Sequence, residues 1–226
     1  GEVESLEQAD GVWHVKFKLG GEKTAKAVVY AAGTSYRHLG VKGEDKQRIS
    51  FCAVCDGFFY KDKTVAVIGG GDTALGDALY LSKLAKTVYL VHRRDEFRAN
   101  KSLQKKVDDT ENIVKIMSAQ LKEITGGANA EGIVYEQAGE EKSLALDGIF
   151  CAVGSVPNTQ LLEGVCKLEG GYAAAGEDCV TSAAGLFAAG DVRTTPLRQV
   201  VTAAADGANA AASAEKYISD NFLAVK

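Results

Sequence analysis

The chain has 226 residues, with 26 Lys and Arg against 30 Asp and Glu, so its formal net charge is −4. This mildly acidic balance argues against a nucleic-acid-binding protein, because such proteins carry a basic domain or stripe. Apolar residues make up 46% of the chain, yet no apolar run reaches the roughly 18 residues of a membrane-spanning helix. The chain does not begin with a basic segment followed by an apolar one, so we expect a cytoplasmic protein without a secretory signal.

The first 34 residues predict short strands. Residues 2–7 and 12–19 alternate between apolar and polar, and an Asp-Gly turn separates them. Residues 24–32 follow a Gly-Gly turn and end in an apolar run. We expect a small antiparallel meander that ends in a buried strand.

Residues 63–91 contain the clearest unit of the sequence. A short apolar strand at 63–68 is followed at once by a glycine-rich turn, a helical pattern at 75–85 and a second strand at 87–91. This order predicts a βαβ unit, and Gly69-x-Gly71-x-x-Ala74 at its first turn is a dinucleotide fingerprint. In such a turn the glycines let backbone approach a pyrophosphate, which the N–H groups of the helix N-terminus bind. The alternative is a tight turn without a ligand.

The rest of the chain alternates strands with helices. Gly190-Asp191 ends one predicted strand, and ligands of open α/β sheets bind at such strand ends. Pro196 is expected in the first turn of a long Ala-rich helix. The expected elements are a helix at 99–107, strands at 112–117, 121–125, 132–137, 143–146 and 148–154, a helical turn at 158–162, a strand at 185–191 and a helix at 196–220.

The end of the second strand indicates which dinucleotide binds. A site for NADH usually has an acidic residue here, but this strand ends in His92-Arg93-Arg94, with Arg98 close behind. Guanidinium groups bind phosphate with two N–H donors, so these residues favour NADPH, which carries a 2′-phosphate. Asp95 lies nearby but beyond the arginines, and a solvated basic turn is the alternative.

Two of the five cysteines form a C-x-x-C pair, Cys52 and Cys55. Such a pair is either a redox disulfide or half of a zinc site, and the lack of a second pair of ligands with metal spacing favours redox chemistry. Asp56 follows Cys55 directly and could carry the proton that thiol–disulfide exchange requires, or it could cap the following turn.

Five separated motifs, which cover essentially the whole chain in order, resemble those of the low-molecular-weight thioredoxin reductases. The matching segments are Cys52 to Phe59, Val65 to Ala74, His92 to Ala99, Gly154 to Thr159 and Ala189 to Val200. The resemblance implies an α/β fold of two Rossmann-like dinucleotide-binding domains of the three-layer ββα type. The NADPH domain would be inserted in the FAD domain.

The resemblance also implies domain boundaries and roles. Residues 35–154 would form the NADPH domain with the redox pair, and residues 1–34 and 155–226 would form a portion of the FAD domain. Electrons would pass from NADPH through FAD to the disulfide and then to thioredoxin, with Cys55 facing the flavin, Cys52 attacking the partner and Asp56 as acid and base. The implied nucleotide-binding residues are Gly69, Gly70, Gly71, Asp72, Thr73, Ala74, His92, Arg93, Arg94 and Arg98 for NADPH, and Gly33, Thr34, Gly190, Asp191, Val192, Arg198, Gln199 and Val200 for FAD.

One departure from the family pattern affects the FAD site. The family opens with a further glycine turn that binds the FAD pyrophosphate, and this chain has only one such turn. We therefore expect an N-terminally incomplete FAD domain with exposed apolar surface, weak FAD binding, and residues 27–32 and 186–190 in one sheet. The family forms homodimers through this domain. The alternatives are a related alkyl hydroperoxide reductase flavoprotein and an inactive NADPH-binding fragment.

Overall fold

The computed structural model describes residues 1–223 and divides the chain into two compact units. The first unit comprises residues 1–35 and 155–226, and the second comprises residues 36–154. None of the helices within residues 1–223 is both long enough and apolar enough to cross a membrane.

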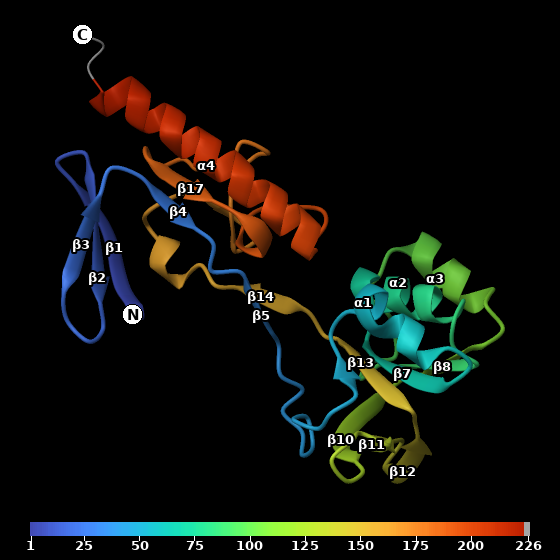
Figure 1. Cartoon of the computed structure of the whole chain (residues 1–226). Coiled ribbons are helices and arrows are strands. Elements are labelled where there is room, and N and C mark those ends of the chain that lie inside the picture. Colours follow the sequence, from blue (N-terminus) through green and yellow to red (C-terminus); the bar gives the residue numbers. More distant parts are fainter. Residues whose placement is uncertain (224–226) are drawn as a thin grey trace. The chain divides into compact units, whose positions relative to one another are not determined.

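The second unit is built on a five-stranded parallel sheet in the order β6-β13-β7-β8-β9. The helices α1, α2 and α3 lie on one side of it, and a three-stranded antiparallel sheet, β10-β11-β12, lies on the other (Figure 1). The bounds are β6 Ile49–Ser50, α1 Ala53–Asp56, η1 Gly57–Tyr60, β7 Thr64–Gly69, α2 Asp72–Leu81, β8 Thr87–Val91, α3 Lys101–Asp108, β9 Ile113–Ile116, β10 Ala119–Thr125, β11 Gly132–Gln137, β12 Glu140–Ala145 and β13 Gly148–Ala152.

Strand β7 is apolar from Val65 to Ile68, because both of its faces are covered. Val65 and Val67 belong to the core beneath the helices, together with Phe150 of β13. Ala66 and Ile68 belong to a separate core against the antiparallel sheet. The two layers fix the carboxyl end of β7, where the glycine turn begins.

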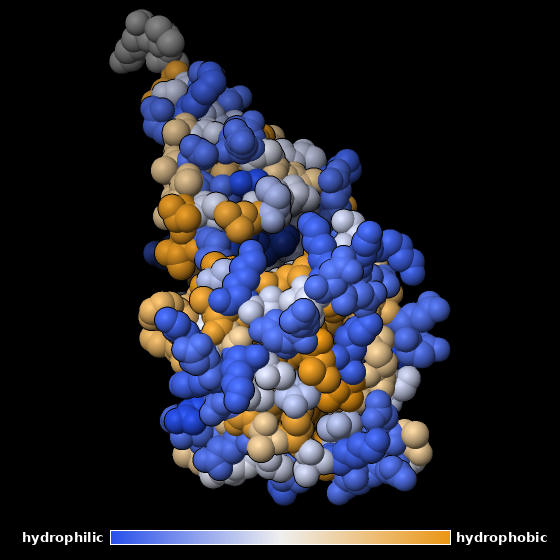
Figure 2. Space-filling model, turned by 90° about the vertical axis from the view of Figure 1, so that its right-hand side faces the viewer, coloured by the Kyte–Doolittle hydropathy of each residue, from blue (hydrophilic) through white to orange (hydrophobic). Residues whose placement is uncertain are grey.

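Figure 2 shows that polar residues cover most of the visible face of this unit, with apolar residues between them.

The first unit contains one three-stranded sheet and three two-stranded pairs, β14-β5, β15-β16 and β17-β4. Strands β1-β2-β3 form an antiparallel sheet, and its Trp13 is 1% exposed in a core with Leu162 and Leu186. The bounds are β1 Val3–Ala9, β2 Val12–Phe17, β3 Glu22–Ala25, β4 Val28–Tyr30, β5 Thr34–Tyr36, β14 Ser155–Pro157, η2 Gln160–Leu162, β15 Leu168–Glu169, β16 Tyr172–Ala173, β17 Leu186–Ala188, η3 Gly190–Val192 and α4 Val200–Phe222.

The expected third strand of the meander is wrong in two respects. Residues 24–32 do not form one antiparallel strand, because β3 ends at Ala25 and β4 begins a new sheet at Val28. Strand β4 pairs in parallel with β17, which places residues 27–32 and 186–190 beside one another as expected. Strand β4 is only half-buried, and Val29 is 44% exposed, so the expected burial of this strand is also wrong.

Helix α4 lies along the β4-β17 pair, as Figure 1 shows. It begins at Val200 rather than near Pro196, so the expected first-turn proline lies outside the helix. The start is set by a capping box, in which the Gln199 N–H donates to Thr202 Oγ1 over 3.1 Å and the Gln199 side chain accepts from the Thr202 N–H.

A buried ion pair attaches helix α4 to the end of β17. The Arg193 guanidinium donates to both oxygens of Asp206, at 2.6 and 2.5 Å, and the side chains are 9% and 7% exposed. The Gly190 N–H donates to the same carboxylate over 3.0 Å. Hydrogen bonding to Arg193 lowers the pKa of Asp206, so the pair is charged at neutral pH. The pair therefore fixes the Gly190 turn against the helix.

Candidate functional site

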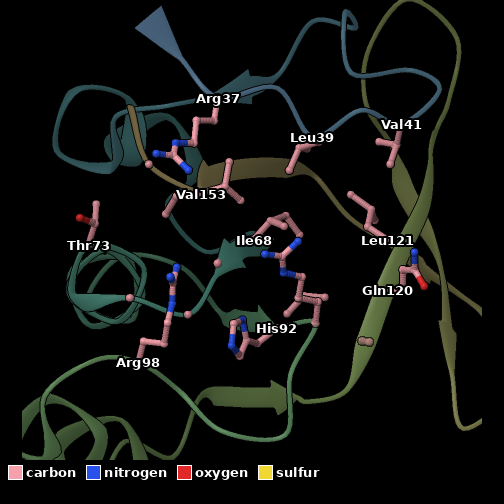
Figure 3. Close-up of a pocket in the computed structure, with 18 of the residues that line it drawn as sticks. Arg37, Leu39, Val41, Ile68, Thr73, His92, Arg98, Gln120, Leu121 and Val153 are labelled. Atoms are coloured by element: carbon pink, nitrogen blue, oxygen red, sulfur yellow. The ribbon is translucent and has the colours of Figure 1, made fainter. Parts of the chain in front are cut away.

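A cavity of about 690 Å³ lies at the carboxyl ends of the parallel strands of the second unit. The ends of three neighbouring strands line it, β13 through Ala152, β7 through Ile68 and β8 through Val91. This is where open α/β sheets bind nucleotides. Figure 3 shows Arg37 and Val153 on one side of the cavity and His92 and Arg98 on the other.

The lining of the cavity combines cationic and apolar side chains. Arg37, Arg93 and Arg98 line it, and among the described residues no Asp or Glu does. Because the whole chain carries a net charge of −4, this concentration of positive charge is local and fits an anionic ligand. The other lining residues are His38, Leu39, Val41, Gly69, Gly70, Gly71, Thr73, His92, Ala119, Gln120, Leu121, Val153 and Gly154.

The three glycines of the turn have different surroundings. A Cβ on Gly69 would lie 2.4 Å from the Ala152 oxygen, and one on Gly70 would lie 2.2 Å from the His92 ring. A Cβ on Gly71 would meet nothing within 4 Å. Gly69 and Gly70 are therefore required by packing, whereas Gly71 leaves room at the cavity for a ligand to approach the backbone of helix α2.

Alanine substitutions separate these roles. Gly71→Ala should leave the thermal unfolding midpoint nearly unchanged, because its φ of −99° suits any residue and the space is open. It should weaken nucleotide binding by about tenfold, since the methyl group occupies the place of the ligand. Gly70→Ala should instead lower the midpoint, because the buried His92 ring must move. Calorimetric titration and thermal melts of both variants check this; equal effects on stability would contradict it.

His92 is a structural residue at the cavity wall. It is 6% exposed, stacks on Phe97 with ring centroids 5.4 Å apart, and donates from Nε2 to the Glu96 carbonyl oxygen over 3.1 Å. Burial lowers the pKa of His92, and the arginines that follow it lower the pKa further. The ring is therefore neutral at pH 7, and the charge at this wall comes from Arg93 and Arg98.

Three residues expected at the nucleotide site do not line the cavity. Asp72 accepts hydrogen bonds from the backbone and side-chain nitrogens of Asn100, at 2.8 and 3.1 Å, and so holds the start of helix α3. Ala74 is fully buried and packs against the Gly69 position, which brings helix and strand close together. Arg94 is absent from the lining, whereas Arg37, which the sequence did not indicate, is part of it.

The cysteine pair forms a disulfide in helix α1, on the same unit. Cys55 is exposed and Cys52 is partly buried. The Ser50 hydroxyl donates to Asp56 Oδ2 over 2.6 Å and accepts from the Cys52 N–H over 3.1 Å. Ser50 therefore connects the Asp56 carboxylate to the redox loop, a contact that no sequence motif indicated.

The remaining cysteines are poor nucleophiles at neutral pH. Burial raises the pKa of Cys151 to about 12, and it also raises the pKa values of Cys166 and Cys179. Since the thiolate is the reactive form, thiol–disulfide chemistry belongs to Cys52 and Cys55. Within residues 1–223 no group of three or more His, Cys, Asp or Glu side chains is placed to bind a metal ion.

The residues expected at a flavin lie in the first unit, and one hydrogen bond joins two of them, Arg198 and Asp191. Arg198 Nε donates to the Asp191 backbone oxygen over 3.4 Å, and its guanidinium stacks on the Tyr172 ring at 4.2 Å. Val200 is 87% exposed. Gly190, Asp191 and Val192 form η3, Gln199 caps helix α4, and Gly33 and Thr34 lie at the start of β5, where the Gly33 oxygen accepts from Asn158.

The chain matches known proteins over nearly its whole length. The family model of the pyridine nucleotide-disulphide oxidoreductases matches residues 2–207. The thioredoxin reductase of Peptoclostridium litorale is 42% identical over 89% of this chain and 68% of its own length. That of Escherichia coli O157:H7 is 43% identical over 88% of this chain and 66% of its own. The chain belongs to the thioredoxin reductase family. It spans about two-thirds of the length of these relatives.

Solved structures agree with this assignment to the thioredoxin reductase family. The thioredoxin reductase of Streptococcus pyogenes MGAS5005 has a TM-score of 0.91 at 36% identity, over 97% of this chain and 74% of that one. That of Giardia duodenalis has a TM-score of 0.86 at 32% identity, over 96% and 74%. Members of the family use FAD and NADPH, so the chain is an NADPH-dependent flavoprotein disulfide oxidoreductase.

Proposed function

We propose that the second unit binds NADPH in its cavity and carries the redox disulfide, and that the first unit is a portion of the FAD domain. The NADPH domain is then an insertion in the FAD domain, as in the expected two-domain arrangement. With FAD and NADPH bound, the Cys52–Cys55 disulfide would receive the electrons of NADPH and pass them on to the disulfide of thioredoxin. The observation that carries this proposal is a cavity lined by three arginines, and by no carboxylate among residues 1–223, on the unit that holds the disulfide.

The cavity fits NADPH in both shape and charge. The glycine turn and the free N–H groups of helix α2 suit the pyrophosphate, and the open position at Gly71 lets it approach the backbone. Arg93 and Arg98 stand at the end of β8, where the adenosine ribose of a dinucleotide binds in this fold. Two guanidinium groups there match the 2′-phosphate that distinguishes NADPH from NADH.

The first unit fits the FAD at fewer points. No hydrogen bond or ion pair of the Asp191 carboxylate is found among residues 1–223, so it is free to accept from a flavin hydroxyl. Leu197, Val200 and Val201 are 52%, 87% and 72% exposed, an apolar surface suited to a flat ring. When bound, FAD supplies two-electron transfer from the nicotinamide to the disulfide.

The chain's own residues carry the thiol chemistry. Reduction of the disulfide takes two electrons and two protons and leaves two thiols at Cys52 and Cys55. One thiolate then attacks the disulfide of thioredoxin, and the second cysteine releases the reduced product by closing the disulfide again. Asp56, connected to the loop through Ser50, holds the proton that the departing thiolate of thioredoxin takes up.

Arg93→Gln tests the choice of NADPH. We expect the affinity for NADPH to fall about tenfold or more, because a charge-assisted hydrogen bond to the 2′-phosphate is lost. The affinity for NADH, which lacks this phosphate, should change less than about twofold. Calorimetric titration of both nucleotides measures the two affinities. Equal losses for both nucleotides would contradict a 2′-phosphate site at Arg93, and an unaltered chain that binds neither would contradict the proposed function itself.

Two further features of the proposal rest on the family alone. Thioredoxin is the proposed disulfide substrate, since the relatives are named for it. A homodimer formed through the FAD domain is the proposed assembly, and analytical ultracentrifugation of the purified chain measures it.

A further inference from the structure

Arg37 is the one arginine of the cavity that the 2′-phosphate does not explain. Arg93 and Arg98 follow strand β8, whereas Arg37 precedes the unit's first strand and reaches the cavity from another direction. Its backbone N–H donates to the Gly154 oxygen over 3.1 Å, just beyond the end of β13. A Cβ placed on Gly154 would lie 3.8 Å from Arg37 Nε, so the side chain lies across this glycine.

The order of the strands separates Arg37 from the other two arginines. Strand β7 lies between β13 and β8, and neighbouring strands are about 4.8 Å apart, so the ends of β13 and β8 are about 10 Å apart. The glycine turn follows β7 and therefore stands between Arg37 and Arg93. Figure 3 shows Arg37 beside Val153, on the side of the cavity opposite His92 and Arg98.

The guanidinium of Arg37 has no ion pair or hydrogen bond within residues 1–223. Among the described residues the cavity offers it no carboxylate, so an anionic ligand is the partner that its charge would attract. A dinucleotide carries negative charge at two places. The 2′-phosphate is present only in NADPH, and the pyrophosphate is present in both NADPH and NADH.

We propose that Arg37 binds the pyrophosphate of the dinucleotide from the side opposite helix α2. The glycine turn and the helix N-terminus then contact one side of the pyrophosphate, and a guanidinium contacts the other. Arg37 supports binding of NADPH and NADH alike, whereas Arg93 selects NADPH. This inference rests on the proposed nucleotide site and adds to it a residue that serves the part common to both nucleotides.

The test is calorimetric titration of the full chain and its variants with three probes: NADPH, NADH and adenosine 2′-phosphate. The last probe carries the 2′-phosphate but no pyrophosphate. Arg37→Gln should weaken NADPH and NADH by a similar factor, about tenfold, and leave adenosine 2′-phosphate within about twofold. Arg93→Gln should show the reverse pattern and weaken NADPH and adenosine 2′-phosphate but not NADH.

Arg48→Gln is the matched control. Arg48 is an exposed arginine of the same unit, directly before β6, and β6 runs parallel to β13. It therefore stands at the edge of the sheet opposite the cavity, and its variant should bind all three probes as the unaltered chain does. Arg37→Lys keeps the charge without the two-donor fork and should recover part of the loss for both dinucleotides.

Three outcomes would overturn the role of Arg37. The Arg37→Gln variant could bind all three probes normally, it could lose adenosine 2′-phosphate together with NADPH, or it could lose no more than the Arg48→Gln control. Each is distinct from a failure of the proposed function, in which the unaltered chain would bind no dinucleotide. Circular dichroism and thermal melts of each variant establish that a loss of affinity is not a loss of folding.

Discussion

Replacing Cys55 with serine should abolish the reduction of thioredoxin by NADPH and leave NADPH binding unchanged. A single thiol at Cys52 cannot close an internal disulfide, so the cycle of thiol–disulfide exchange stops after one attack. Neither cysteine lines the cavity, so the affinity for NADPH should stay within about twofold. Turnover with added FAD and calorimetric titration measure the two quantities separately.

Comparing Cys55→Ser with Cys52→Ser identifies the attacking cysteine. If Cys52 attacks the partner, Cys55→Ser keeps the attacking thiol and should accumulate a mixed disulfide with a thioredoxin disulfide, visible as a slower band in non-reducing gels. Cys52→Ser should accumulate much less of it. The variant with both Cys52→Ser and Cys55→Ser is the control and should form no mixed disulfide. Burial raises the pKa values of the other three cysteines and makes them poor nucleophiles.

Two results would contradict this assignment. Undiminished turnover of Cys55→Ser would remove the pair from the mechanism. A mixed disulfide in the double variant would place the chemistry at Cys151, Cys166 or Cys179 instead.

Local sequence patterns were enough to predict the βαβ unit at residues 63–91. The sequence of β7 does not alternate between apolar and polar residues, because both faces of the strand are covered. The continuous run of apolar residues predicted a strand there, directly before the glycine turn. The strand, glycine turn and helix follow each other without a gap, so the position of the turn was fixed by sequence. The roles of Gly69 and Gly71 follow from steric reasons that any such turn shares.

Contacts between distant segments could not be predicted in this way. Arg37 lies 32 positions before Gly69 in the sequence, and only the pairing of its backbone with Gly154 brings it to the cavity. The predicted start of helix α4 was wrong because a proline is tolerated in the first turn of a helix but does not determine where the helix begins. The reciprocal hydrogen bonds of Gln199 and Thr202 determine the start at Val200. The pair of Arg193 and Asp206 joins a turn to a helix that sequence spacing alone does not orient.

Replacing Asp206 with alanine should lower the free energy of unfolding of the first unit by about 3–5 kcal/mol, because it leaves the Arg193 guanidinium buried without its counter-charge. Both side chains are less than a tenth exposed, so water cannot take the place of the carboxylate. Trp13 is the chain's single tryptophan, it lies in this unit, and it is 1% exposed. Its fluorescence during urea unfolding therefore reports on the first unit alone.

Asp220→Ala is the matched control for this change. Asp220 lies on the same helix and pairs with Lys216 over 3.0 Å, but these two side chains are 59% and 76% exposed. An exposed pair contributes roughly 0–1 kcal/mol, so this variant should unfold almost as the unaltered chain does. Equal losses of unfolding free energy in the two aspartate variants would contradict a larger contribution of the buried pair.

The effect of Asp206→Ala should also depend on pH. Hydrogen bonding to Arg193 holds the pKa of Asp206 below its ordinary value of 3.8, so the carboxylate stabilises the fold above that pH and ceases to do so once it is protonated. The difference in unfolding free energy between the unaltered chain and Asp206→Ala should therefore narrow as the pH falls below 3.8. A constant difference from pH 7 to pH 3 would contradict an electrostatic origin.

The double variant Arg193→Met with Asp206→Leu separates the ion pair from the hydrogen bonds that the two side chains make with backbone. Apolar replacement of both charges removes the uncompensated guanidinium, so most of the loss seen in Asp206→Ala should be recovered. The Gly190 N–H, which donates to the same carboxylate, then has no acceptor, and the Ala175 and Thr194 oxygens lose the Arg193 donor, so a deficit of about 1–3 kcal/mol should persist. Full recovery would mean that water replaces these backbone hydrogen bonds easily. A persistent deficit would show that the backbone hydrogen bonds of Asp206 and Arg193 stabilise the first unit in addition to their ion pair.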